Sequence, residues 1–346
     1  MIKTTQGNLL EADAEALVNT VNCVGVMGKG IALQFKQAFP DNFIEYAKVC
    51  REKQMKPGRV LVFKTESMLN PKYIINFPTK RHWKGRSKME DIDSGLVDLI
   101  AQVKRLDIQS IAIPPLGAGL GGLNWSEVKH RIEAAFAELP DVRVLLFEPK
   151  GAPPVEQMPV RTKRPNMTLG RALLIRLLDL YGRQGYRRSL LEVQKLAYFL
   201  QEAGQPMKLN FQAEDFGPYA ENLNHTLQHI EGHFIRGYGD RSARAEIRLM
   251  PNATELAREF LDKKPGAEKH LERVKQLIEG FETPYGMELL STVHWVVTHE
   301  PRIKGDLDAI RARVASWNER KKDLMKPRHI QKAYEHLEMQ GWVSAG

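Results

Sequence analysis

Short apolar runs alternate with amphipathic segments along the first 150 residues. The apolar runs are rich in Val, Ile and Phe, as buried strands are, and occur at 16–22, 60–63, 73–77, 110–114 and 143–147. Between them, apolar residues recur every three or four positions, the spacing of a helix face, at 31–35, 43–54, 90–106 and 126–139. This alternation predicts an α/β domain in which helices flank a mixed central sheet.

The remainder of the chain is dominated by helical periodicity. Apolar residues recur at helical spacing at 169–181, 189–203, 219–231, 255–261, 267–281, 285–298, 307–317 and 327–339. Residues 245–250 differ, because Ile247 and Leu249 alternate there with Glu246 and Arg248, which indicates a short strand or hairpin. We expect a mostly α-helical second domain.

Prolines and cations separate the two patterns. The residues that interrupt regular structure or keep this stretch solvated are Pro149, Pro153, Pro154, Pro159, Arg161, Lys163, Arg164 and Pro165. A chain of 346 residues is long enough for two domains of ordinary size. We therefore place a first domain at 1–150, a linker at 151–167 and the mainly helical domain at 168–346.

The chain is basic overall. Its 51 Lys and Arg residues outnumber its 42 Asp and Glu residues, and the net charge of +9 suits an anionic partner such as nucleic acid. The N-terminus has no apolar leader segment, and no run of about 18 apolar residues occurs. We expect a cytoplasmic protein without a membrane partner.

Neither the cysteines nor the histidines predict a metal site. Cys23 and Cys50 are too few for a disulfide framework or a cysteine zinc site, and we interpret Cys23 as a packing residue. His225, His229 and His233 are spaced as neighbours on one helix face, which favours a partly buried or partner-facing polar stripe. Their spacing does not match the zinc peptidase motifs. We expect no metal and no cofactor.

Two glycine-rich turns each connect a predicted strand to a predicted helix, at residues 25–30 and 117–122. Glycine allows positive φ and close approach of a ligand, and a helix N-terminus adds unpaired N–H groups, so such turns bind phosphate. The first turn is not a P-loop, since no Ser or Thr follows Lys29. A dinucleotide-binding fingerprint is disfavoured for the second, which follows a strand late in its domain. Together the turns predict a diphosphate held from two sides.

The loop after residue 77 has the composition of a nucleic-acid-binding segment. It carries Lys80 and Lys88 at its two ends and five predicted DNA contacts between them, Arg81, His82, Trp83, Lys84 and Arg86, with no acid. Phosphates attract the cations, and an unpaired base can stack on Trp83 for about 1–3 kcal/mol. A solvated basic loop is the alternative interpretation.

These motifs, in this order, resemble the macrodomain pattern over residues 1–150. Gly7-Asn8-Leu9-Leu10, the strand at 16–22 and the two glycine turns match the elements with which macrodomains bind ADP-ribose. The resemblance implies that Asn8 and Leu9 contact adenine and that Asn22 contacts the distal ribose. It implies that the diphosphate is bound by Gly25, Val26, Met27, Gly28, Lys29, Gly30, Leu116, Gly117, Ala118, Gly119, Leu120 and Gly121. Macrodomains usually carry Asp at the position of Asn8, whose NH2 group cannot accept a hydrogen bond from adenine.

Within the macrodomains, Asn76-Phe77-Pro78-Thr79 followed by Lys80 is similar to DarG-type antitoxins and to terminal ADP-ribose protein glycohydrolases. The resemblance implies that Lys80 is catalytic, in a DNA ADP-ribosyl glycohydrolase. A neutral amine can attack an anomeric carbon, and neighbouring cations and partial desolvation would lower the pKa of such a lysine. The acid that partners the lysine in the protein glycohydrolases is replaced here by Gly121. The general acid or base therefore stays open among a substrate phosphate, an ordered water and His82.

Domain order extends the resemblance to the second domain. Residues 191–200 and Phe216-Gly217-Pro218-Tyr219 loosely resemble antitoxin-associated helical domains. The implied partners are ADP-ribosylated single-stranded DNA for the first domain and a cognate DarT-type toxin, a DNA ADP-ribosyltransferase, for residues 168–346. Two alternatives stay open. One is a non-catalytic ADP-ribose reader fused to an interaction domain, and the other is a macrodomain hydrolase of ADP-ribosylated protein or O-acetyl-ADP-ribose.

Overall fold

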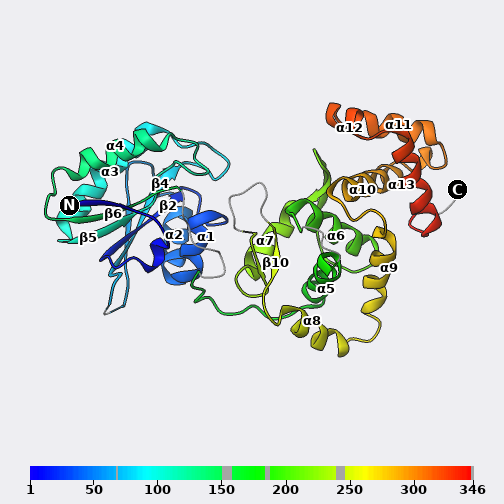
Figure 1. The fold of residues 1–346 in the computed structure, drawn as a ribbon, viewed down its shortest axis with the longest axis horizontal. Helices are drawn as coiled ribbons and strands as arrows, with labels where there is room; N and C mark the ends of the chain where they lie inside the picture. Colours follow the sequence, from blue (N-terminus) through cyan, green and yellow to red (C-terminus); the bar gives the residue numbers. More distant parts are fainter. Residues whose placement is uncertain (68, 150–157, 184–187, 239–245, 344–346) are drawn as a thin grey trace. The chain divides into compact units, whose positions relative to one another are not determined.

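The computed structural model describes residues 1–67, 69–149, 158–183, 188–238 and 246–343, which form two compact units (Figure 1). The first unit extends to Lys163 and the second begins at Arg164. The beginning of the predicted linker, residues 151–157, lies outside the described residues. Further along, Met158 is buried with the core of the first unit, and the Arg161 N–H donates to the Gln37 carbonyl at 2.8 Å.

A six-stranded mixed sheet forms the centre of the first unit. Its strands are β1 (Ile2–Thr5), β2 (Ala16–Asn22), β3 (Leu61–Lys64), β4 (Tyr73–Lys80), β5 (Ser110–Ile113) and β6 (Arg143–Phe147). They lie in the order β1-β6-β5-β2-β4-β3, and every pair is parallel except β3 with β4. The predicted α/β class with a mixed central sheet is confirmed.

Helices cover both faces of this sheet (Figure 1). α3 (Met89–Arg105) and α4 (Trp125–Phe136) pack on one face, and η1 (Leu9–Glu11), α1 (Gly30–Ala38) and α2 (Pro40–Arg51) lie on the other. Along β2, Ala16 and Val18 join the core beneath α3 and α4, whereas Leu17 joins the core with Phe35 of α1. A strand covered on both faces must be apolar at successive positions, which is why β2 appears as one continuous apolar run.

Helix α3 is amphipathic and also carries a residue of the site. Ile92, Leu96 and Leu99 lie on its buried face, and acids in the first turn with cations in the last turn complement the helix dipole. Gly95 permits close packing, because a Cβ there would lie 2.3 Å from the Phe77 ring. The tight contact fixes the first half of α3 against β4, the strand that ends in Lys80.

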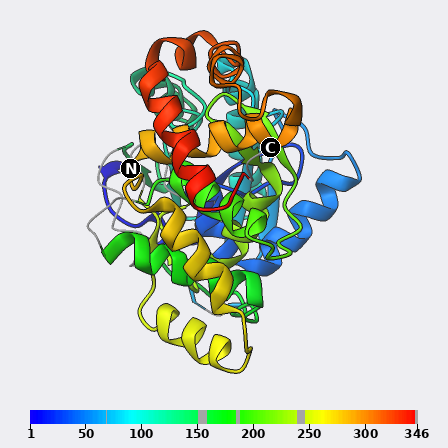
Figure 2. The ribbon, with the colours of Figure 1, turned by 90° about the vertical axis from the view of Figure 1, so that its right-hand side faces the viewer.

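The second unit is mostly helical, which confirms the prediction. Its helices are α5 (Leu169–Arg183), α6 (Leu190–Glu202), α7 (Glu221–Ile230), α8 (Ala253–Asp262), α9 (Glu268–Ile278), α10 (Pro284–His299), η3 (Pro301–Ile303), α11 (Leu307–Ala315), α12 (Glu319–Leu324) and α13 (Pro327–Met339). α13 packs across α10 (Figure 2). α6 and α10 are buried on most sides, and Ser189 and Glu192 form a capping box at the start of α6.

Short strands in the second unit correct one prediction. β7 (Phe211–Glu214) pairs with β8 (Gly217–Ala220) as a hairpin, and β9 (Ile235–Arg236) pairs with β10 (Arg248–Leu249), within the expected strand region 245–250, of which residue 245 is not described. The helix predicted at 219–231 begins only at Glu221, since the preceding residues belong to β8. It ends at Ile230, so His233 lies beyond the helix and the three histidines do not share one helix face.

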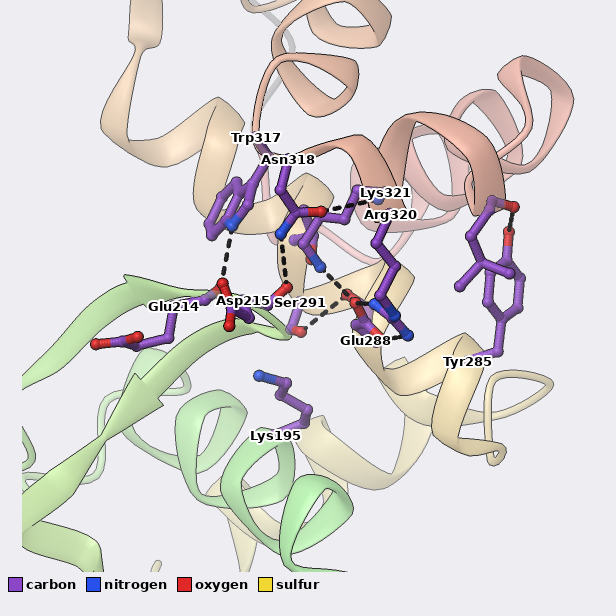
Figure 3. A network of polar contacts seen from close by, with 12 residues as sticks. Lys195, Glu214, Asp215, Tyr285, Glu288, Ser291, Trp317, Asn318, Arg320 and Lys321 are labelled. Atoms are coloured by element: carbon purple, nitrogen blue, oxygen red, sulfur yellow. Dashed lines mark hydrogen bonds and ion pairs between the residues drawn. The ribbon is translucent and has the colours of Figure 1, made fainter. Parts of the chain in front are cut away.

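A polar network connects the β7–β8 hairpin to α10 and α12 (Figure 3). The Trp317 Nε1–H donates to the Glu214 carbonyl and Asn318 Nδ2 donates to the Asp215 carbonyl, both at 3.0 Å. Beneath the hairpin, the buried Lys321 ammonium donates to a Glu288 carboxylate oxygen at 2.5 Å. The network fixes the hairpin turn on the residues that lead into α12, and Lys321 joins α12 to Glu288 of α10.

Two cations accompany the buried Glu288 carboxylate. Arg320 donates to both of its oxygens at 2.7 and 3.0 Å, and the pKa of Glu288 is lowered, because hydrogen bonds from Arg320 and Lys321 outweigh the effect of its burial. Lys195, 1% exposed, donates to the Pro218 carbonyl at 2.7 Å instead. Its burial and the nearby Lys321 charge lower the pKa of Lys195 to about 7.

Among the helices of the described ranges, none has both the length and the apolar character that crossing a membrane requires.

Candidate active site

Three loops meet at one edge of the sheet of the first unit. β5, β2 and β4 are parallel neighbours, so their carboxyl ends lie at the same edge. The second glycine turn (residues 117–122) follows β5, the first glycine turn (residues 25–30) follows β2, and the basic loop (residues 81–88) follows β4. Ligands of α/β sheets bind at this edge. The fold therefore brings the two turns and Lys80 together, as their positions after predicted strands indicated.

Asn22, the last residue of β2, organises the first glycine turn. Its Oδ1 accepts hydrogen bonds from the N–H groups of Val24 and Val26 at 2.9 and 3.4 Å, and its Nδ2 donates to the Val26 carbonyl at 2.5 Å. The buried Tyr46 hydroxyl donates to the Asn22 carbonyl at 2.8 Å. The Asn22 side chain is thus already hydrogen-bonded to the turn, and a bound ribose would contact a side chain that also holds the turn in shape.

Some residues in and just before the first glycine turn are buried in the core, and others lie at the surface. Met27 is 1% exposed and packs with Val21 and Tyr46, so a ligand can contact only its backbone. Val24 and Val26 are exposed. Burial first, and then the neighbouring Cys50, raise the pKa of the Cys23 thiol to about 11, so Cys23 stays protonated and behaves as a packing residue.

The two helices that follow the turns differ at their N-termini. Within the described residues, no side chain caps α1, whose first N–H groups carry the partial positive charge that attracts an anion. α4 is capped, because Asn124 Oδ1 accepts from the Ser126 N–H at 2.9 Å. The expectation of unpaired donors at the helix after the second turn is therefore corrected in part, and α1 is the better electrostatic anchor.

The second glycine turn is closed by its own backbone. The Ala118 N–H donates to the Pro115 carbonyl, Gly122 to Gly119, and Leu123 to Gly117. Gly117 has φ +65, the left-handed region that favours glycine. Among the described residues, no acceptor pairs with the N–H groups of Gly119, Leu120 and Gly121. Leu116 is fully buried, so its side chain belongs to the core. The turn therefore offers successive backbone donors to an anion.

Lys80 is delivered to this turn by an irregularity in β4. Val21 of β2 pairs with Pro78 and Asn22 pairs with Lys80, so Thr79 is an additional residue in β4. Such a bulge accommodates a proline, which has no N–H, and redirects the residue that follows. The Lys80 ammonium then donates to the Leu120 carbonyl at 2.5 Å. The predicted catalytic amine therefore lies directly against the second glycine turn.

The basic loop combines a paired arginine with an exposed aromatic stack. Arg81 Nη2 lies 3.1 Å from a carboxylate oxygen of Asp91, an acid 5% exposed, although the Arg81 side chain itself is 63% exposed. The rings of His82 and Trp83 stack at 5.4 Å, and the Lys84 ammonium lies 4.9 Å from the centre of the Trp83 ring. This stack lies at the surface. Arg86 is exposed as well.

Asn8 and Leu9 lie at the start of η1. Asn8 Oδ1 accepts from the Leu10 N–H at 3.1 Å and so caps the short helix, and within the described residues its buried Nδ2 has no partner. Leu9 is 4% exposed and packs with Leu17. With its oxygen engaged, Asn8 presents a donor rather than an acceptor, so adenine recognition through this side chain would use a ring nitrogen of the base.

Sequence reasoning missed Ser87, Asp91 and Tyr46. Tyr46 supports Asn22 from α2, Asp91 pairs with Arg81 from the first turn of α3, and the Ser87 N–H donates to the Gly121 carbonyl at 3.0 Å. Each of these residues contacts a partner that is distant along the chain or lies in another element, so no local pattern in the sequence indicates the contact. The acid at the N-terminus of a predicted helix was the sole available signal for Asp91, and it also fits an ordinary helix terminus.

Known proteins share sequence with the first unit and with the whole chain. The Macro domain family model matches residues 18–132. The chain is 49% identical to the DNA ADP-ribosyl glycohydrolase of Thermus aquaticus, over 99% of this chain and 94% of that protein. It is 36% identical to a DNA ADP-ribosyl transferase-DNA ADP-ribosyl glycohydrolase fusion protein of Thermosipho africanus, over 37% of each. Its first unit is similar to the solved macrodomain of Mycobacterium tuberculosis DarG, with 53% identity, coverage of 43% of this chain and 99% of that one, and a TM-score of 0.43.

Proposed function

The chain belongs to the DNA ADP-ribosyl glycohydrolase family of macrodomain proteins, and from that premise we propose that its first unit removes ADP-ribose from a base of single-stranded DNA. The observation that carries the proposal is the hydrogen bond from the Lys80 ammonium to the Leu120 carbonyl. It holds the amine at the turn that has unpaired N–H groups for a diphosphate. The reacting sugar, joined to that diphosphate, would then lie within reach of the amine.

The binding half of the proposal uses the loops of the sheet edge. We propose that the diphosphate lies between the uncapped N-terminus of α1 and the second glycine turn, with adenine at Asn8 and Leu9 and the distal ribose near Asn22. The support is electrostatic, because both backbone segments present N–H donors to an anion. Together these contacts would hold the glycosidic carbon near Lys80.

The chemical half assigns the lysine as nucleophile. After its proton passes to water, the Lys80 amine attacks the anomeric carbon, and the electron pair of the glycosidic bond leaves on the base, which takes a proton from water. The sugar ring of this lysine adduct then opens to a protonated Schiff base, which water hydrolyses to release ADP-ribose and restore the lysine. The sum is the hydrolysis of one N-glycosidic bond. No acid of the second glycine turn takes part, since that turn contains none.

We propose that the basic loop binds the DNA strand beside the modified base. Its charges are not equivalent, because Arg81 is already paired with Asp91, whereas Lys84 and Arg86 are exposed. A base can stack with the Trp83 ring, which is 41% exposed, and the phosphates of the strand can contact Lys84 and Arg86.

For the second unit, residues 168–346, we propose that it binds and neutralises a DarT-type DNA ADP-ribosyltransferase, which would make the chain an antitoxin. The support is the Thermosipho africanus relative, whose name joins the transferase and the glycohydrolase in one protein. Co-expression with such a transferase, with and without residues 168–346 and with Lys80 replaced in both, tests this claim separately from hydrolysis. Rescue of growth by the Lys80-replaced full chain supports neutralisation, and failure of rescue removes it.

The enzymatic claim is tested with a single-stranded oligonucleotide that carries ADP-ribose on one base. Lys80→Ala should keep its affinity for free ADP-ribose within about threefold yet release none of it from the oligonucleotide. Lys3→Ala, which alters an exposed lysine of β1, is the matched control and should retain turnover. Full turnover by Lys80→Ala would exclude the lysine mechanism.

The same assay separates the alternatives. A reader would bind ADP-ribose, but the unaltered chain would leave the oligonucleotide intact. A protein hydrolase would release ADP-ribose from modified protein, and replacing Lys84 and Arg86 by glutamine would not slow it. Reduction with borohydride during turnover should leave ADP-ribose on Lys80, as intact mass and peptide mapping would show. Absence of that adduct would favour attack by water.

A further inference from the structure

The basic loop is attached to the second glycine turn at both of its ends. At its beginning, the Lys80 ammonium donates to the Leu120 carbonyl at 2.5 Å, and at its end the Ser87 N–H donates to the Gly121 carbonyl at 3.0 Å. The two acceptors are consecutive carbonyls. Residues 81–86 therefore leave and rejoin the protein at one short segment of backbone, and the segment is the one we propose for the diphosphate.

Side-chain packing reinforces the second attachment. A Cβ added to Gly121 would lie 2.2 Å from Ser87 Oγ and 2.2 Å from the Gly117 carbonyl oxygen, so Ser87 occupies the space of a side chain at position 121. A Cβ at Gly117 would also lie 3.1 Å from Ser87 Oγ. Within the described residues this hydroxyl is buried and has no hydrogen-bond partner. Its contribution to the contact is therefore its small volume, which fits between the two glycines.

The peptide group between Leu120 and Gly121 connects the two sides of the turn. A trans peptide carries its C=O and its N–H in opposite directions. Here the C=O accepts from Lys80, while the Gly121 N–H has no acceptor among the described residues. An anion bound by that N–H would fix the plane of the peptide and increase the polarity of its carbonyl. The next peptide carries the Gly121 carbonyl that accepts from Ser87, so both attachments of the basic loop depend on these two planes.

We propose that Ser87 is a positioning residue through which the diphosphate site and the nucleic-acid loop are coupled, so that ADP-ribose and single-stranded DNA bind with positive cooperativity. The inference rests on the proposed function, because it takes the glycine turn as the diphosphate site and the basic loop as the DNA site. Simple electrostatics predicts the opposite sign, since two anions bound side by side repel each other. If ADP-ribose and DNA strengthen each other's binding, the effect must therefore come from the backbone that joins the two sites.

The test measures binding of a labelled, unmodified single-stranded oligonucleotide to the full chain with and without saturating free ADP-ribose. We expect ADP-ribose to raise the oligonucleotide affinity at least about fivefold, and the oligonucleotide to raise the ADP-ribose affinity by the same factor. Ser87→Val, which replaces the hydroxyl by a methyl group and adds a second methyl group against the two glycines, should reduce the factor to about one. Ser126→Val, an exposed serine of α4, is the matched control and should keep the wild-type factor.

Two further variants keep the test decisive. Ser87→Ala retains the backbone N–H and a small side chain, so it should keep coupling; a loss as large as in Ser87→Val would assign the effect to the hydroxyl and overturn the packing argument. Lys80→Met removes the other attachment and should also abolish coupling, which carries the test if Ser87→Val does not fold.

The possible failures are distinguishable. If both ligands bind the wild type with a factor of one or less, the coupling is wrong and the proposed function stands. If the oligonucleotide does not bind, or binds equally well after Lys84 and Arg86 are replaced by glutamine, the proposed DNA site is wrong and the coupling falls with it.

Discussion

Gly121→Ala should disable the second glycine turn by crowding. The added Cβ would lie 2.2 Å from both the Gly117 carbonyl oxygen and Ser87 Oγ, and 2.8 Å from the Gly117 carbonyl carbon. Carbon contacts of this kind require more than about 3 Å. The backbone oxygen cannot rotate away as a flexible side chain can. The turn must therefore shift by about 1 Å, away from the partners that hold it.

The structure sets the size of this effect. Overpacking of a well-packed site costs about 1–3 kcal/mol of folding stability. The shift also weakens the hydrogen bonds that the Leu120 and Gly121 carbonyls accept from Lys80 and Ser87, each worth about 1 kcal/mol. If restoring the shape of the turn around ADP-ribose costs about 1.4 kcal/mol of that overpacking penalty, the ADP-ribose dissociation constant rises by about tenfold.

Gly122→Ala is the matched control in the same turn. Gly122 has φ +78, and nothing lies within 4 Å of an added Cβ. The cost is therefore backbone strain of about 1–2 kcal/mol without a clash. We expect Gly122→Ala to be destabilised no more than Gly121→Ala and to bind ADP-ribose within about threefold of the wild type.

Calorimetric titration with ADP-ribose and thermal unfolding of the three proteins provide the comparison. We expect both variants to lose stability and only Gly121→Ala to lose affinity for ADP-ribose. If Gly121→Ala binds ADP-ribose as tightly as Gly122→Ala does, then the packing of Ser87 against the turn has no part in ligand binding, and the geometric account of the site is refuted.

Three other predictions concern residues outside the turn. Burial lowers the pKa of Lys195 from 10.5 to about 7, so between these pH values the unfolded chain binds a proton that the folded chain does not. The free energy of unfolding of the second unit should therefore rise by about 1.4 kcal/mol per pH unit across that window and be lowest below pH 7. Hydrogen exchange of α6 and α10 peptides, corrected for intrinsic rates, measures this rise, and its persistence in Lys195→Met would assign it to another group. Glu288→Ala leaves the buried Lys321 charge unpaired and should cost about 3–5 kcal/mol in chemical denaturation, part of which Lys321→Met should restore in the double variant. No recovery in the double variant would mean that lost packing, rather than an unpaired charge, dominates. Tyr46→Phe removes the buried hydroxyl that supports Asn22 and should cost about 1–3 kcal/mol and weaken ADP-ribose binding, whereas unchanged affinity in calorimetry would show that the first glycine turn keeps its shape without Tyr46.

Periodicity predicted the main elements because they bury continuous or regularly spaced apolar positions. The strands at 16–22 and 143–147 match β2 and β6 residue for residue, and α3 lies within one residue of its predicted bounds at each end. The hairpin of β7 and β8 escaped prediction, since Gln212 and Glu214 are exposed and Pro218 interrupts the apolar pattern. Its strands are held by cross-strand pairing and by Trp317 and Asn318 instead, neither of which leaves a local signal.

The candidate site was predicted in outline but not in its connections. Positions after strand ends indicated that the two turns and Lys80 would meet, and they do. The sequence could not indicate that Arg81 is paired with Asp91, because that contact depends on where α3 begins relative to β4. Nor could it indicate that Ser87 fills the space beside Gly121, since a serine in a basic loop gives no sign of its neighbours.

The double attachment of the basic loop has a consequence for redesign. Because both ends of residues 81–86 are held at the adjacent carbonyls of Leu120 and Gly121, the residues between can be made more or fewer, or changed in charge, without moving the Lys80 amine. Replacing this loop alone could then change which nucleic-acid strand, flanking sequence or other polymer the enzyme prefers, while the residues that cleave the bond stay in place.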